Sequence, residues 1–304
     1  MAKETITNKM HYLALTSIAV LLWSSLAVLV AQLSHIPAFF LLACGLFIGG
    51  SLSLVQYKQW QLQPKLLLVG VGGIFGYHFL LFMALRTAPP VAANLLNYLW
   101  PLFILLLTPL FFNDIALRKR HILGALISLT GAGLIVVADS ATNAAEFSNA
   151  HIVGYILAIL AALTWACYSL LTKKLTRQYQ QFGSATVGLF CLISAGLAAV
   201  SHVTFESTPT LSWSDARLLF ILGLGPLGVS FYCWDAAVKK GDPRVIATMS
   251  YFTPFLSTLL LIIFSEQVFG QRIFLAMSLI VAGALVANVN LALLVKRYQG
   301  VFSR

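Results

Sequence analysis

Long apolar runs alternate with short polar stretches along the whole sequence. A helix needs about 17 to 25 predominantly apolar residues to span a bilayer, and the runs have that length. They cover residues 12–31, 37–55, 66–85, 91–112, 122–138, 152–172, 184–203, 218–238, 245–265 and 273–295. The pattern therefore predicts an all-α integral membrane protein with ten transmembrane helices.

Parts of the first half recur in the second half. The segment Asn97-Tyr98-Leu99-Trp100-Pro101 matches Ser250-Tyr251-Phe252-Thr253-Pro254 at an offset of 153 residues, and Trp23 matches Trp165 at an offset of 142. This self-similarity predicts two units of five helices, over residues 10–138 and 151–296. Because five is odd, the second unit enters the membrane from the opposite side. Such an inverted-topology repeat is typical of secondary transporters.

The composition narrows the class of protein further. Only 9% of the 304 residues carry a charge and 60% are hydrophobic, whereas roughly a quarter of an ordinary soluble domain is charged. These values exclude a globular cytosolic enzyme, a disordered chain and a secreted disulfide scaffold. We therefore expect the lipid bilayer to be the main environment of this chain.

The net charge of +10 predicts an orientation. If the N-terminus is cytoplasmic, 16 of the 19 Lys and Arg residues fall on the inner side, and only Arg86, Arg217 and Arg272 fall outside. This bias follows the positive-inside rule and predicts that both termini are cytoplasmic. The bases stand singly or in twos and threes between apolar runs, so no basic surface for nucleic acid is expected.

No motif predicts catalysis, a cofactor or a metal site. The four cysteines lie inside apolar runs, and their spacing matches no metal pattern. The six histidines are scattered, and the sequence holds no HExxH, GxSxG or phosphate-cradling loop. A membrane-embedded enzyme would need such a cluster, so we expect a protein that is not an enzyme. The oligomeric state stays open, and a monomer is compatible with the sequence.

Two prolines mark the expected binding region. Pro101 and Pro254 both fall near the middle of predicted helices, at symmetric positions of the repeat. Each removes a backbone donor and crowds the carbonyl four residues earlier, that of Asn97 or of Ser250. Helices interrupted at mid-depth are a pointer to transporter binding sites. We therefore expect these prolines to act as hinges, although a plain packing kink is the alternative.

Polar and aromatic residues near these prolines are the expected substrate contacts. Asn94, Asn97 and Tyr98 share one helix face with Pro101, and Ser250 and Tyr251 share one with Pro254. Such groups would be costly against lipid, so both faces should line a wet cavity or a polar helix interface. Other aromatic residues lie at mid-depth rather than at the membrane interfaces, and a flat solute could stack on them. These are Trp23, Tyr77, Trp100, Trp165, Tyr168, Tyr232 and Trp234.

Two titratable residues have open roles. His78 lies within the third predicted helix and is either a histidine hydrogen-bonded inside the bundle or a group for proton coupling or substrate binding. Asp235 is the one acid inside an apolar run, but Lys239 follows four residues later. A helix ion pair therefore explains Asp235 as well as a coupling role does.

The repeat and its motifs resemble the drug/metabolite transporter superfamily, in the branch with two EamA-type domains. The resemblance rests on Ala84-Leu85 and Ala237-Val238, on the paired tryptophans and on the two prolines, and it covers essentially the whole chain. Within the superfamily, residues 97–101, 165–168 and 250–254 look like segments of bacterial aromatic amino acid exporters. A departure is Asp235, where such proteins lead us to expect an amide.

This resemblance implies a location in the bacterial inner membrane and the export of phenylalanine, tyrosine and tryptophan through a central cavity between helices 1–4 and 6–9. The cavity residues that it implies are Trp23, Tyr77, His78, Tyr98, Trp100, Trp165 and Tyr251. We therefore expect export of aromatic and related amino acids by alternating access. The export is either coupled to a second gradient or occurs by facilitated diffusion. The alternative is a multidrug or other metabolite exporter of the same superfamily.

Overall fold

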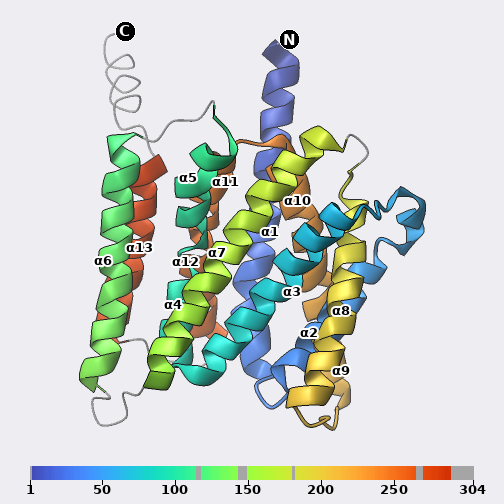
Figure 1. The fold of residues 1–304 in the computed structure, drawn as a ribbon. Coiled ribbons are helices and arrows are strands. Elements are labelled where there is room, and N and C mark those ends of the chain that lie inside the picture. Colours follow the sequence, from blue (N-terminus) through green and yellow to red (C-terminus); the bar gives the residue numbers. More distant parts are fainter. Residues whose placement is uncertain (1, 114–117, 143–148, 180–181, 265–269, 289–304) are drawn as a thin grey trace.

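The computed structural model describes residues 2–113, 118–142, 149–179, 182–264 and 270–288, and within these ranges every regular element is a helix (Figure 1). The elements are α1 (Ala2–Gln32), α2 (Ala38–Ser51), η1 (Leu54–Gln59), α3 (Pro64–Thr87), α4 (Pro90–Asn97), α5 (Trp100–Phe111), α6 (Lys119–Thr142), α7 (Asn149–Gln178), α8 (Ala185–Phe205), α9 (Trp213–Leu224), η2 (Gly225–Val229), α10 (Ser230–Lys240), α11 (Pro243–Ser250), α12 (Phe252–Phe264) and α13 (Gln271–Asn288).

Six helical segments of the described chain are long and apolar enough to cross a membrane. They are Met10–Gln32, Pro64–Thr87, Ala92–Phe111, Asn149–Gln178, Ala185–Phe205 and Trp213–Lys240. Shorter apolar helices cover Ala38–Ser51 and Phe274–Gly283. The helix predicted over 37–55 is present, but its predicted end is wrong, because α2 ends at Ser51 and the 3₁₀ helix η1 follows. The end of the last predicted run, 289–295, lies outside the described residues.

The predicted kinks are present as short interruptions of one or two residues, at which the backbone stays close to helical dihedral angles. The run 91–112 is divided into α4 and α5, and the run 245–265 is divided into α11 and α12. Pro101 lies in the first turn of α5, where its missing N–H leaves no helical bond unmade. A third interruption was not predicted: the π-helix η2 separates α9 from α10. Single-turn π-helices often occur at functional sites.

Close helix contacts explain how the bundle is assembled. Helix α6 packs along α13 at one edge of the molecule (Figure 1), and a Cβ added to Gly283 would lie 2.5 Å from the carbonyl oxygen of Gly124. A Cβ added to Gly131 would lie 2.7 Å from the Ala276 carbonyl oxygen of α13, whereas one added to Gly133 would meet open space. Helix α3 packs on α7, and α2 packs on α8 and η2. Helices α6 and α13 thus lie at the edge of the bundle, whereas α2, α3 and α7 lie nearer its centre, where they can line a cavity.

Candidate functional site: a cavity above four tryptophans

A cavity of about 210 Å³ lies at the centre of the bundle. Its described lining residues are Trp23, Leu26, Val30, Ala38, Leu41, Leu42, Tyr77, His78, Leu81, Phe82, Leu85, Arg86, Asn94, Asn97, Tyr98, Trp100, Trp165, Leu222, Leu227, Phe231 and Thr253. The lining residues of α1 lie between Trp23 and the C-terminal end of that helix. Those of α2 begin at its first residue, Ala38, and those of α3 extend to Arg86, next to its last residue. These three helix ends meet at one end of the bundle, which we call the cavity end.

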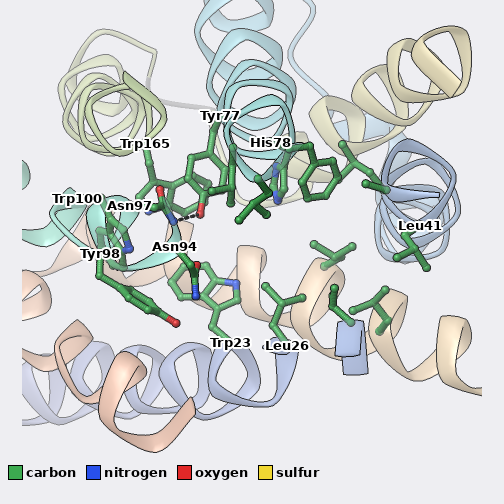
Figure 2. Close-up of a pocket in the computed structure, with 18 of the residues that line it drawn as sticks. Trp23, Leu26, Leu41, Tyr77, His78, Asn94, Asn97, Tyr98, Trp100 and Trp165 are labelled. Atoms are coloured by element: carbon green, nitrogen blue, oxygen red, sulfur yellow. Dashed lines mark hydrogen bonds between the residues drawn. The ribbon is translucent and has the colours of Figure 1, made fainter. Parts of the chain in front are cut away.

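The cavity opens at the cavity end and is closed at its other side. Val30 and the Arg86 side chain, at the mouth, are 39% and 37% exposed, respectively. The opposite limit is a cluster of tryptophan rings, which we call the floor and which is drawn in part in Figure 2. Beyond the floor lies the end of the bundle where α7 and α10 end and α8 and α11 begin, and we call it the sealed end.

The floor consists of Trp23, Trp100, Trp165 and Trp234, from helices α1, α5, α7 and α10. Every pair of these rings has its centroids between 5.2 and 6.4 Å apart. Most pairs meet edge to face or tilted, the arrangements that aromatic quadrupoles favour. Trp23 donates its Nε1 hydrogen to the carbonyl of Pro226 in η2 at 3.1 Å, which ties the floor to the π-helix. Trp234 lies beneath the others and is 1% exposed.

Polar groups on one wall stand directly above the floor. The amide Nδ2 of Asn97 donates to the hydroxyl of Tyr77 at 3.0 Å (Figure 2), while its buried Oδ1 has no partner among the described residues. His78 lies on the same wall, and its Nδ1 is 2.7 Å from the carbonyl oxygen of Ile74. Since a carbonyl only accepts, Nδ1 carries a proton, and a neutral ring keeps Nε2 as an acceptor. The wall thus offers unused acceptors beside aromatic faces.

The structure brings most of the predicted site residues to this cavity. Trp23, Tyr77, His78, Asn97, Tyr98, Trp100 and Trp165 line it, as does Asn94 from the predicted polar face. Tyr168, Ser250 and Tyr251 do not line it. Tyr168 packs behind Trp165 in a tilted arrangement with the ring centroids 5.3 Å apart, and the Ser250 hydroxyl donates to the carbonyl of Ile246 within α11. Tyr251 is 2% exposed, and its hydroxyl has no partner among the described residues.

Sequence reasoning missed several lining residues because they carry no polar signal. Leu41 and Leu42 of α2, Leu227 of η2 and Phe231 of α10 are ordinary apolar residues of a membrane helix. The seventh predicted helix, over 184–203, corresponds to α8. It adds no residue to the described lining, contrary to the expectation for a cavity between helices 1–4 and 6–9. Tyr232 also points elsewhere, and its hydroxyl donates to the carbonyl of Gly49 at 2.9 Å.

The sealed end is held by a lysine that caps a helix. Lys173 of α7 donates from Nζ to the carbonyl oxygens of Val238, Lys239 and Gly241, at 3.0, 3.2 and 2.7 Å. These are orphan acceptors at the C-terminus of α10, where the helix dipole favours a cation. Tyr12 of α1 closes over the same turn, since a Cβ on Gly241 would lie 2.7 Å from its ring.

A buried ion pair lies one turn deeper. Lys239 Nζ is 2.7 Å from Oδ2 of Asp235, and the two side chains are 6% and 0% exposed. Ser184, before α8, donates to the same carboxylate oxygen at 2.7 Å, and the ammonium sits 3.5 Å from the centroid of the Phe182 ring. The structure therefore contains the helix ion pair that the sequence offers as one explanation of Asp235.

The turn between α10 and α11 is fixed by a second carboxylate, that of Asp242. Asp242 accepts from the backbone N–H of Arg244 at 2.9 Å and pairs with the Arg244 guanidinium at 2.7 Å. Burial acts to raise the pKa of Asp242, but hydrogen bonds from Arg244 and the charges of Arg244 and Lys173 outweigh it and hold the pKa below its usual value. The carboxylate is thus charged at neutral pH and caps the start of α11.

Known proteins resemble this chain over nearly its full length. Residues 10–137 and 152–289 each match the EamA-like transporter family. The aromatic amino acid exporter YddG of Ancylobacter novellus is 36% identical over 281 residues, which cover 89% of this chain and 94% of that protein. The protein of the same name from Escherichia coli K12 is 24% identical over 257 residues, which cover 80% of this chain and 85% of that protein.

A solved structure has the same architecture. It is the crystal structure of a protein that is 34% identical to this chain, with a TM-score of 0.78, and the alignment covers 92% of this chain and 96% of the other. The sequence and structural matches therefore extend over both halves of the chain.

Proposed function

Because the chain belongs to the EamA-like transporter family, we propose that it exports phenylalanine, tyrosine, tryptophan and related amino acids by alternating access through the cavity. The family and the apolar helices identify a multi-pass membrane transporter. The relatives named as aromatic amino acid exporters support the substrate class.

The observation that carries the proposal is the chemistry of the cavity. Its floor presents tryptophan rings, on which a flat side chain can stack. Beside them, the Oδ1 atom of Asn97 is a buried acceptor without a partner in the described part of the chain, and it suits a substrate ammonium group. An aromatic amino acid carries both complementary groups within one small molecule.

The proposed architecture is ten transmembrane helices in two inverted units, at residues 10–138 and 151–296. Two observations support it. Helices α4 and α11 have the same length and begin and end at residues exactly one repeat offset apart, Pro90 with Pro243 and Asn97 with Ser250. The two helices also lie toward opposite ends of the bundle (Figure 1). An inverted repeat gives two related conformations, open to opposite sides, as alternating access requires.

The proposed orientation places both termini in the cytoplasm of a bacterial inner membrane. The sealed end carries Lys174, Arg177, Lys239, Lys240 and Arg244, whereas the bases of the described chain at the cavity end are Arg86, Arg217 and Arg272. By the positive-inside rule the cavity then faces outward in this structure. Opening toward the cytoplasm would involve the helix breaks beside Pro101 and Pro254, which are the proposed hinges.

Uptake of labelled phenylalanine into inside-out vesicles tests the proposal. Trp100→Ala removes a ring from the floor, and we expect uptake to fall at least about tenfold, since stacking of one aromatic pair and its burial contribute a few kcal/mol. Trp213→Ala is the matched control because Trp213 is 87% exposed and lies outside the cavity. Equal uptake by both variants would refute the site. Transport of cationic dyes without phenylalanine would instead identify a multidrug exporter.

A further inference from the structure

The cavity holds a permanent charge at its mouth. Among the described lining residues, Arg86 is the one Lys, Arg, Asp or Glu, and most of the others are apolar. A charged side chain in the membrane part of a protein is costly and faces a cavity or a partner. Arg86 does both, because it lines the cavity and pairs with Glu206.

Glu206 fixes the position of this guanidinium. Its side chain is 2% exposed, and it accepts the Nη2 hydrogen of Arg86. The Arg86 Cζ atom also lies 5.4 Å from the centroid of the Phe39 ring, within the range of a cation–π contact. The guanidinium is therefore held on two sides before any ligand arrives, which lowers the ordering cost of binding.

The charge of Glu206 has further partners besides Arg86. Its carboxylate accepts the backbone N–H groups of Phe39 and Phe40, at 3.0 to 3.2 Å, and its Oε2 lies 2.9 Å from Nδ1 of His202. The two N–H groups belong to the first turn of α2, where the helix dipole is positive. The positive charge of Arg86 is thus only partly offset by Glu206.

Arg86 keeps donors for a second acceptor. A guanidinium has five N–H donors, and the described residues accept from Nη2 alone. Its side chain is 37% exposed, against 2% for Glu206, so the remaining donors can be reached from the cavity. The planar fork of a guanidinium matches a carboxylate better than any other side chain does.

We propose that Arg86 binds the carboxylate group of the amino acid substrate at the mouth of the cavity. The inference rests on the proposed export of amino acids and assigns the charge recognition to one residue. Arg86 follows His78 by eight residues on α3, so it lies about 12 Å nearer the cavity end. Because the ammonium and carboxylate groups are attached to the same carbon atom, the substrate meets Arg86 in a step separate from its contact with Asn97, on the path between the aromatic floor and the open end.

Two fragments of phenylalanine test the proposal on the unmodified protein. 3-Phenylpropionate keeps the carboxylate and lacks the ammonium group, and phenethylamine keeps the ammonium and lacks the carboxylate. Binding of each is measured by quenching of tryptophan fluorescence on purified protein in detergent. We expect 3-phenylpropionate to bind at least about tenfold more tightly, the ratio for one charge-assisted hydrogen-bond pair. Equal binding, or tighter binding of phenethylamine, would overturn the proposal without any substitution.

Substitutions then assign the preference to Arg86. Arg86→Gln should reduce the tenfold preference to within about threefold, and Arg86→Lys should keep part of it because the charge remains without the fork. Arg217→Gln is the matched control, since Arg217 is exposed on α9 near the same end and outside the cavity lining. A thermal unfolding curve checks that each variant is folded. A folded Arg86→Gln protein with an unchanged preference would contradict the proposal.

The outcomes separate this inference from the proposed function. If the unmodified protein neither binds nor transports phenylalanine, the proposed function fails. If it transports phenylalanine but its preference for the carboxylate fragment does not depend on Arg86, the substrate class stands and only the assignment to Arg86 fails.

Discussion

Each end of the bundle is held by a charged side chain that caps a helix, a cation at the sealed end and an anion at the cavity end. At the sealed end, Lys173 caps the C-terminus of α10, and the Asp235–Lys239 pair lies beneath it. At the cavity end, Glu206 caps the N-terminus of α2 and pairs with Arg86. Both arrangements place a charge at the helix end whose dipole it complements.

The two ends differ in which helices they join. The sealed-end contacts tie α7 and the segment before α8 to α10, with α1 closing over the same turn. The Glu206 cluster joins α2, α3 and α8, and none of the ion pairs in the described residues connects these to α4, α5, α11 or α12. Opening the sealed end therefore requires the loss of buried polar contacts, whereas the cavity end is already open in this structure.

Removal of Asp235 should have the largest effect. Asp235→Ala leaves the ammonium of Lys239 without a counter-ion, and that side chain is 6% exposed. An unpaired buried charge costs about 3 to 5 kcal/mol of unfolding free energy, which thermal and denaturant unfolding in detergent can measure. The double variant Asp235→Leu with Lys239→Met removes both charges and should recover most of the loss. A double variant as unstable as the single one would show that the pair matters for reasons other than charge burial.

Removal of the Lys173 cap should have an intermediate effect, on the balance between the two conformations. Lys173→Met leaves the carbonyls of Val238, Lys239 and Gly241 without their shared donor. We expect a shift of about 2 to 3 kcal/mol toward opening at the sealed end, as for hydrogen bonds to a charged group. The readout is labelling of a cysteine placed at Ser169, in a background without the native cysteines. Ser169 is 1% exposed and accepts from Nε1 of Trp234 at 3.1 Å, so it lies on the sealed side of the floor.

The neighbouring Lys174 is the control for this shift. Lys174 is exposed on the same helix and donates none of these bonds, so Lys174→Met should leave the labelling rate unchanged. Equal labelling of both variants would mean that the Lys173 cap does not restrain the sealed end.

Removal of Glu206 should have the smallest effect of the three. Glu206→Ala strands Arg86, but the Arg86 side chain is 37% exposed and water can solvate it. We expect a loss of about 1 to 2 kcal/mol, mainly from the lost cap on α2. Unfolding under the conditions used for Asp235→Ala provides the comparison. A loss equal to that of Asp235→Ala would contradict the distinction between a partly solvated end and a buried one.

Several features could be predicted because their causes act within a few residues. A proline removes a donor from its own helix, so the interruptions near Pro101 and Pro254 were visible in the chain. Asn97 and Trp100 share the interrupted segment, and both line the cavity. The third interruption, η2, contains Pro226 and so carries the same local signal, but its π-helical form also depends on the packing of Gly49 of α2 against the backbone of Leu227.

The sequence by itself determined the all-helical membrane character, the positions of the apolar runs and most aromatic residues of the site. Only the tertiary structure decided that Tyr251 lies behind the cavity rather than in it, and that Arg86 meets a carboxylate 120 residues away. The physical reason is the range of the forces. Hydrophobicity and missing backbone donors act on the local chain, whereas the side of a helix that faces the cavity is set by neighbours from distant segments.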